Sequence, residues 1–196
     1  MYEAAADPYC YPGSSVLKNR LDLRTQRELE TYEKFISHQR ADEPLPTGKF
    51  SYSHYRAIHR HLFSDVYTWA GRIRTIRIAK DDSWFCYPEH IDREMHRIFE
   101  ELAGDNLLRD LDAETFARKA AHFLAELNAI HPFREGNGRA QTSFLSILAD
   151  QAGHPLDLER LERLGDPSAM MHAMIASFTG DEQSLTKLLL QLMRAR

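Results

Sequence analysis

The sequence predicts an all-α fold, a helical bundle that carries one β-hairpin. Apolar residues recur every three or four positions over most of the chain, which is the spacing of one helix face. Only the stretch between residues 73 and 87 alternates in the way of paired strands. The chain has 196 residues, room for one well-packed core, so we expect residues 1–196 to form a single domain.

Composition narrows the class of protein. Hydrophobic residues make up 43% and charged residues 28% of the chain, a balance typical of globular proteins. The net charge of -4 argues against a nucleic-acid-binding protein, because that class needs a basic surface. Two cysteines, Cys10 and Cys86, are too few for a disulfide framework and favour a reducing compartment.

Targeting signals are missing from the pattern. No apolar run approaches the length of about 18 residues that a membrane span needs. Residues 1–13 are acidic and aromatic, whereas a secretory signal is basic and then apolar. We therefore expect a cytoplasmic protein, unless a dedicated secretion system exports it.

Two helices are predicted in the first third of the chain. Residues 1–13 form a turn-rich lead because of their prolines and glycine. Thr25 and Ser53 are predicted N-caps, and residues 41–48 link the two helices. Their apolar faces comprise Leu29, Tyr32 and Ile36 in the first helix and Tyr55, Ile58, Leu62 and Phe63 in the second.

The hairpin is predicted over residues 73–87. Ile76 and Ile78 alternate with Arg77, residues 84–87 are short and aromatic, and residues 81–83 are suited to the turn. A two-stranded ribbon often only covers the edge of a core. Periodicity alone therefore leaves the role of this hairpin open.

Helices fill the rest of the chain. One helix spans residues 91–102 and ends at Gly104, and Asp112 caps a longer one that reaches Ile130. Another buried helix stops at Gly153. Three shorter helices are predicted over 158–164, 167–178 and 181–192.

Most of the interpretable chemistry lies in residues 131–139, His-Pro-Phe-Arg-Glu-Gly-Asn-Gly-Arg, which we call the signature loop. Glycines allow close approach to a phosphate, and a helix N-terminus attracts anions. A helix stop followed by a turn would explain Pro132 and the glycines. It would not explain the combination of His131, Glu135, Asn137 and Arg139.

The signature loop resembles the HxFx(D/E)GNGR signature of the Fic family at every specified position. This resemblance implies a Fic-like helical bundle with the hairpin as a flap over the active site. It also implies an enzyme, a protein adenylyltransferase that transfers AMP from ATP to a Ser, Thr or Tyr hydroxyl. Phe133 is expected to pin the loop to the core.

The resemblance assigns roles within the loop. His131 is the expected general base, because an imidazole can take up a proton near neutral pH and this one would face an anion-binding turn. Glu135 is either a solvated carboxylate or the ligand of Mg²⁺, since a carboxylate beside phosphates needs an intervening cation. The predicted nucleotide-binding set is Gly136, Asn137, Gly138, Arg139, Thr142 and Lys80.

Residues 65–80 resemble the segment that leads into the Fic flap, which binds an extended target by strand addition. Ile76, Arg77 and Ile78 are the predicted target-docking residues. Arg74, Arg77 and Lys80 are interpreted either as solvated strand residues or as a preference for an acidic target. Family precedents for the target include DNA topoisomerases and small GTPases.

One position departs from the family pattern. The usual second arginine, three residues after Arg139, is Thr142 here, so the grip on the γ-phosphate should be weaker. The inhibitory (S/T)xxxE(G/N) motif is not found, which resembles members controlled by a small antitoxin that supplies a glutamate, or members sent out as effectors. The alternative functions are a weakened binding module, a phosphotransferase or another nucleotidyl transferase.

A zinc site is rejected. His59 and His61 are two positions apart, so they point to different faces of a helix, and neither HExxH nor CxxC occurs.

Overall fold

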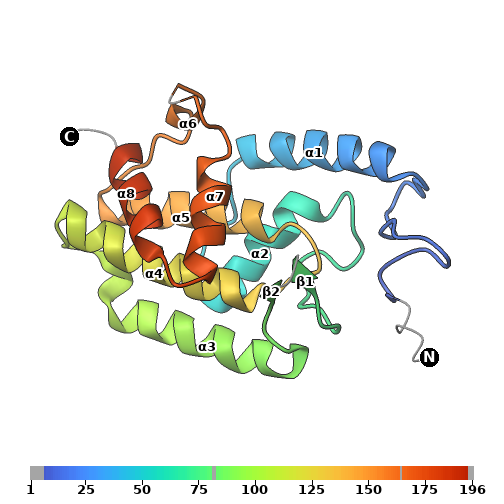
Figure 1. The fold of residues 1–196 in the computed structure, drawn as a ribbon, viewed down its shortest axis with the longest axis horizontal. Coiled ribbons are helices and arrows are strands. Elements are labelled where there is room, and N and C mark those ends of the chain that lie inside the picture. Colours follow the sequence, from blue (N-terminus) through green and yellow to red (C-terminus); the bar gives the residue numbers. More distant parts are fainter. Residues whose placement is uncertain (1–6, 81–82, 164, 194–196) are drawn as a thin grey trace.

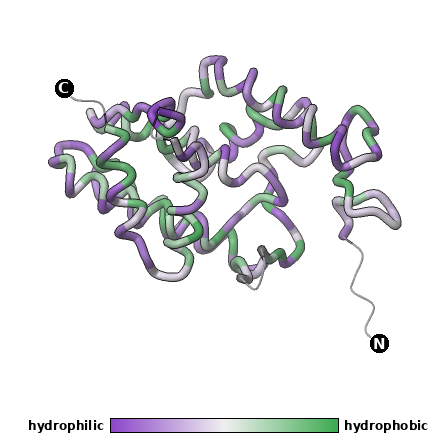
Figure 2. Tube along the Cα trace, turned by 45° about the horizontal axis from the view of Figure 1, so that its top comes forward, coloured by the Kyte–Doolittle hydropathy of each residue, from purple (hydrophilic) through white to green (hydrophobic). Residues whose placement is uncertain are grey.

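The computed structural model describes residues 7–80, 83–163 and 165–193, without the side chains of residues 80 and 83. The described chain is a bundle of α-helices with one short strand pair at its side (Figure 1). Hydrophilic and hydrophobic residues alternate along the helical turns (Figure 2), so one side of each main helix faces the core. The all-α prediction is confirmed.

The helices in chain order are α1 (Gln26–Asp42), α2 (Tyr52–Phe63), α3 (Pro88–Gly104), α4 (Ala113–Ile130), α5 (Asn137–Ala152), α6 (Arg160–Arg163), α7 (Ala169–Phe178) and α8 (Glu182–Leu192), with a 3-10 turn at Asn106–Leu108. Helix α5 packs against α2 and α4, while α3, α7 and α8 cover other sides of α4. The signature loop therefore joins the two central helices of the bundle.

Side chains cap the starts of α1, α2, α4 and α8. Thr25 accepts from Glu28 N before α1, and Asp112 accepts from Thr115 N before α4, as predicted. The predicted cap at Ser53 is wrong, because Ser51 accepts from His54 N and α2 begins at Tyr52, directly after Ser51. Both serines suit a cap by residue type, and the extended backbone of Ser51 decides between them.

The strand pair is much shorter than the predicted ribbon. Strands β1 (Ala79–Lys80) and β2 (Ser83–Trp84) pair antiparallel, with Ala79 opposite Trp84. One more bond, from Phe85 N to Ile78 O at 3.2 Å, extends the pairing toward the core. Residues 73–78 have no strand assignment. The predicted turn residues Asp81 and Asp82 lie outside the described residues.

An aromatic cluster lies beneath the signature loop. Phe133 is fully buried, and its ring stacks on His59 with 3.7 Å between centroids. Tyr55 and Phe144 continue the cluster into α2 and α5. Burying a phenylalanine side chain contributes about 1.5–3 kcal/mol. Phe133 thus anchors the loop to the core, as predicted.

Candidate active site

The signature loop begins where α4 ends. His131 is the C-cap of α4 and has a left-handed backbone with φ 49°. Its N–H still donates to Leu127 O at 3.0 Å, so the last turn of the helix is complete. Pro132 cannot continue a helix, and the chain leaves α4 at this residue. Together these features fix the direction in which the His131 side chain leaves the helix.

The His131 ring contacts a backbone carbonyl and an aromatic ring. Its Nδ1 lies 3.3 Å from Asn128 O, and the ring stacks on Phe85 at 3.8 Å and 18°. Because a carbonyl oxygen can only accept, Nδ1 carries the proton in this pair. Nε2 is then the ring atom that can accept a proton. Phe85 comes from the hairpin segment, so the hairpin lies directly against His131.

Asn137 closes the loop on itself. Its Oδ1 accepts from Phe133 N at 2.9 Å, and its Nδ2 donates to Phe133 O at 2.8 Å. The side chain is 2% exposed, and these two bonds satisfy both backbone polar groups of a buried residue. The Asn137 amide therefore shapes the loop, and only its backbone N–H lies at the start of α5.

The N-terminus of α5 is shaped for an anion. The first α5 residue whose N–H donates to the backbone at this end is Ala140, to Gly136 O at 3.1 Å, which leaves the preceding N–H groups of the first turn without helical acceptors. Gly136 has φ 80°, and a Cβ there would lie 2.4 Å from the Phe63 ring. A Cβ on Gly138 would meet nothing within 4 Å. Gly138 thus opens the first turn to a ligand.

His59 supports the loop from below. Its Nδ1 accepts from Gly71 N and its Nε2 donates to Glu135 O, both at 2.9 Å. Desolvation in this fully buried site lowers the pKa of His59 to about 3. The imidazole is therefore neutral and structural. The sequence excluded His59 as a zinc ligand but offered no signal for this role.

Arg139 is held by helix α1. Its guanidinium pairs with the Glu33 carboxylate and donates to Ser37 Oγ at 2.8 Å. The Tyr67 hydroxyl donates to the same Glu33, and burial is the main cause that raises the Tyr67 pKa. The Glu135 carboxylate lies 3.7 Å from Arg139. Three charged or polar side chains thus reach Arg139, and Tyr67 supports one of them by donating to Glu33.

Glu33 was missed by the sequence reading, although a signal existed. Leu29, Glu33 and Ser37 are the buried residues of α1 and follow each other at intervals of four. A carboxylate in an otherwise buried stripe indicates a buried partner. The partner itself could not be predicted, because it lies 106 positions along the chain.

Glu135 is the only predicted metal ligand. Its side chain is 44% exposed, and Oε1 accepts from Gly136 N at 2.8 Å. Among the described residues, no three His, Cys, Asp or Glu side chains are grouped to hold a metal ion. One carboxylate next to phosphate oxygens is nevertheless a usual arrangement for Mg²⁺, which keeps several waters. The donor set fits a metal that arrives with a nucleotide.

The predicted target-docking residues of the hairpin differ in exposure. Ile76 and Ile78 are half-buried, whereas Arg77 is exposed and lies between the Trp84 and Tyr87 rings, 4.1 and 4.0 Å from their centroids. The Lys80 side chain lies outside the described part of the chain. The half-buried Thr142 is on α5, one turn after Arg139.

Arg74 corrects the sequence reading. We interpreted it as a solvated residue or as a contact for an acidic target, and it is 1% exposed. Within the described residues, its guanidinium donates to backbone carbonyls alone, among them His131 O at 2.8 Å. Alternation along a strand could not reveal this, because residues 73–78 do not form a regular strand.

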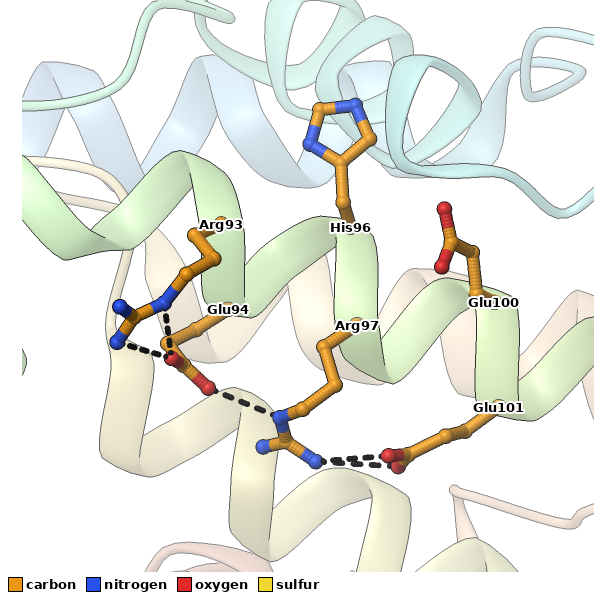
Figure 3. A pocket seen from close by; sticks show the side chains of 6 residues that line it. All are labelled: Arg93, Glu94, His96, Arg97, Glu100 and Glu101. Carbon is orange, nitrogen blue, oxygen red and sulfur yellow. Dashed lines mark hydrogen bonds and ion pairs between the residues drawn. The ribbon is translucent and has the colours of Figure 1, made fainter.

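A charged hollow lies along α3 (Figure 3). Arg97 pairs there with Glu94, Glu101 and, from α4, Glu126, and Arg93 pairs with Glu94. Because these charges satisfy one another on a solvated helix, they form an ion-pair network and not a binding site.

Within the described residues, no helix is both long and apolar enough to cross a bilayer.

The family model that matches the chain is that of the Fic/DOC family, over residues 49–149. A probable protein adenylyltransferase, y4lH of Sinorhizobium fredii, is 52% identical over 181 residues, 92% of each chain. Protein adenylyltransferase VbhT of Bartonella schoenbuchensis is 39% identical over 96% of this chain, which spans 39% of that longer protein.

Solved structures agree with these relatives. The Fic domain of a Bep effector from Bartonella quintana, with bound ADP, has a TM-score of 0.83 at 28% identity and covers 96% of this chain and 95% of its own. BepC of Bartonella tribocorum, with bound AMPPNP, has a TM-score of 0.82 at 26% identity, with 96% and 97% covered.

Proposed function

The chain belongs to the Fic/DOC family, and from that membership we propose that it is a protein adenylyltransferase. It would transfer AMP from ATP to a Ser, Thr or Tyr hydroxyl of a target protein. The observation that carries the proposal is that one loop holds a histidine at the end of α4 and a glycine-flanked N-terminus of α5. Relatives named adenylyltransferases and neighbours with bound ADP or AMPPNP support it.

The α- and β-phosphates would bind at the first turn of α5. Backbone N–H groups of Asn137 and Gly138 would provide the anion hole, joined by that of Gly136 once its bond to the Glu135 carboxylate is released. A Cβ on Gly138 would meet nothing within 4 Å, so the hole is open at this residue. Arg139 would brace the outer phosphates by charge-assisted hydrogen bonds. Lys80 and Thr142 complete the proposed set, with Thr142 contributing a hydroxyl in place of a guanidinium.

Glu135 would hold Mg²⁺ together with the phosphate oxygens, and its half-exposed carboxylate fits this role. When bound, the metal supplies neutralisation of the phosphate charge. The carboxylate also shares Arg139 with Glu33, at 3.7 Å. Glu135 would therefore lie between a bound metal and Arg139, the cation that would brace the phosphates.

The chemical step uses His131 as general base. Nε2 takes the proton of the target hydroxyl, whose oxygen forms a bond to the α-phosphorus. The bond from the α-phosphorus to the bridging oxygen breaks in line, and pyrophosphate leaves. The contact of Nδ1 with Asn128 O keeps Nε2 as the proton acceptor. Positioning and preorganised dipoles supply most of the rate enhancement.

The hairpin would act as the flap that receives the target. Ile76, Arg77 and Ile78 would bind an extended segment through main-chain hydrogen bonds. Ile78→Pro removes one N–H from this edge, so modification of the target should be lost while ATP binding persists. Loss of both target modification and ATP binding would indicate misfolding.

The wider setting is also proposed. Residues 1–196 would form one Fic-type domain, and the partner would be a target protein bound at the flap. Several structural neighbours are described as VirB-translocated effectors, which supports action inside a host cell as one alternative to action in the bacterial cytoplasm. A small antitoxin would have to inhibit without an arginine at residue 142.

The experiment is incubation with α-labelled ATP and a cell lysate, followed by separation of the proteins and mass spectrometry of any labelled band. Label should be lost in His131→Ala and retained in His38→Ala, which alters an exposed histidine of α1. General-base catalysis contributes about 10²- to 10⁴-fold. Equal labelling by His131→Ala would contradict the proposal, as would transfer of γ-label without α-label.

A further inference from the structure

Arg74 is a buried guanidinium that is held by backbone carbonyls. Its side-chain donors reach His131 O at 2.8 Å, Ile76 O at 2.7 Å, and Cys86 O and Ile130 O at 2.6 and 3.1 Å. Its own N–H donates to Pro132 O at 2.9 Å. Among the described residues, Arg74 forms no ion pair, although it is 1% exposed.

This arrangement has an electrostatic reason. The carbonyls of Ile130 and His131 belong to the C-terminal end of α4, where the helix has no N–H partners for them and carries partial negative charge. Desolvation lowers the Arg74 pKa to about 10, so the guanidinium stays charged at neutral pH. The helix end and the two further carbonyls offset the cost of its burial.

The acceptors come from three segments of the chain. Two belong to the end of α4, one precedes β1, and one follows β2. The same region contains the bond from Cys86 N to Ala129 O and the stacking of Phe85 on His131. The planar, forked guanidinium reaches all three segments at once.

We propose that Arg74 is a positioning residue that sets the hairpin and His131 in one fixed register. It acts through the carbonyl of His131 and through the carbonyls of Ile76 and Cys86, which flank the strand pair. It is not proposed to contact ATP or the target. This inference rests on the proposed function, because the register matters for catalysis only if the hairpin carries the target. Displacement of a reacting group by about 1 Å can lower a rate about a hundredfold.

The test compares Arg74→Lys with Arg74→Gln and with Arg72→Gln, whose exposed arginine lies two residues earlier in the same segment. Arg74→Lys keeps the charge but cannot span three segments, and it provides a second variant if Arg74→Gln does not fold. Each protein is measured for transfer rate at saturating ATP, for AMPPNP affinity, and for amide hydrogen exchange.

For Arg74→Lys we expect the transfer rate to fall about a hundredfold, with an AMPPNP Kd within about threefold of wild type, because the nucleotide binds at α5 and not at Arg74. Exchange in residues 76–80, 84–87 and 129–133 should accelerate together, while α5 and α8 keep their protection. Arg72→Gln should match wild type in all three measurements.

Other outcomes overturn the inference. A transfer rate equal to that of Arg72→Gln shows that Arg74 does not couple the hairpin to His131. Faster exchange in the hairpin (residues 76–80 and 84–87) without faster exchange in residues 129–133, or the reverse, shows the same. Parallel loss of rate, AMPPNP affinity and protection throughout the bundle shows a general structural role. If wild type transfers no AMP, the proposed function fails, while hydrogen exchange still decides whether Arg74 links the hairpin to His131.

Discussion

The two ends of the signature loop are held by opposite kinds of interaction. At its start, neutral carbonyl oxygens at the end of α4 accept hydrogen bonds from the buried Arg74, and the His131 ring contacts Asn128 O and Phe85. At its end, Arg139 is held by the carboxylate of Glu33 and faces that of Glu135. The Arg139 side chain is 34% exposed.

This difference separates the part of the loop that positions His131 from the part that sets the affinity for ATP. Carbonyl oxygens keep their character at all pH values, so the start of the loop holds His131 in a fixed position. The charges at the other end compete with a phosphate for the same guanidinium, so a ligand can redistribute them. We therefore expect changes near His131 to alter kcat and changes near Arg139 to alter the KM for ATP.

The largest expected effect on the KM for ATP is at the charged end. Arg139→Gln should raise the KM for ATP about thirtyfold, since a hydrogen bond to a charged group contributes about 2 kcal/mol. The kcat at saturating ATP should change little. The control is Arg134→Gln, because Arg134 lies in the same loop but pairs with Asp7. A lower kcat with an unchanged KM would remove the distinction between the two ends.

Acid should weaken the support beneath the loop. The unfolded chain protonates His59 near pH 6.5, whereas the folded protein does so only near pH 3. The unfolded state therefore binds more protons over this range, and stability falls as the pH falls. Between pH 7 and pH 5 the free energy of unfolding should decrease by about 2 kcal/mol from this group alone. Urea unfolding of wild type and His59→Gln at both pH values measures this decrease. An equal change in the free energy of unfolding between the two pH values in both proteins would contradict the prediction.

Restoring the missing cation should strengthen nucleotide binding. Thr142→Arg places a guanidinium one helical turn after Arg139, so the KM for ATP should fall about tenfold. Steady-state kinetics with varied ATP provide the measurement. An unchanged or higher KM would show that Thr142 is not the reason for a weak grip on the γ-phosphate.

The smallest expected effect is at Glu33. Glu33→Gln removes the charge that shares Arg139 but keeps a hydrogen-bonding side chain, so the KM for ATP should fall about threefold. Glu30→Gln, at an exposed position of α1, is the matched control. If the KM rises instead, the carboxylate orients Arg139 toward the phosphates and does not compete with them.

Local patterns predicted the parts of this protein that depend on neighbouring residues. Helical spacing located the main helices, and Thr25 and Asp112 could be recognised as caps because a cap acts within three residues. The hairpin was overestimated, because alternation at Ile76 and Ile78 predicts a strand even where the chain is held by a single buried arginine. Residue type alone could not separate Ser51 from Ser53 as the cap of α2, and the prediction chose the wrong serine.

The sequence by itself determined the helical fold, the family and the residue types of the signature loop. The tertiary structure alone decided which groups hold that loop. Glu33 reaches Arg139 across 106 positions, Arg74 reaches His131 across 57, and His59 reaches Glu135 across 76. Such contacts follow from how helices pack and not from local spacing, so a buried charge in the sequence shows that a partner is needed but not which one it is.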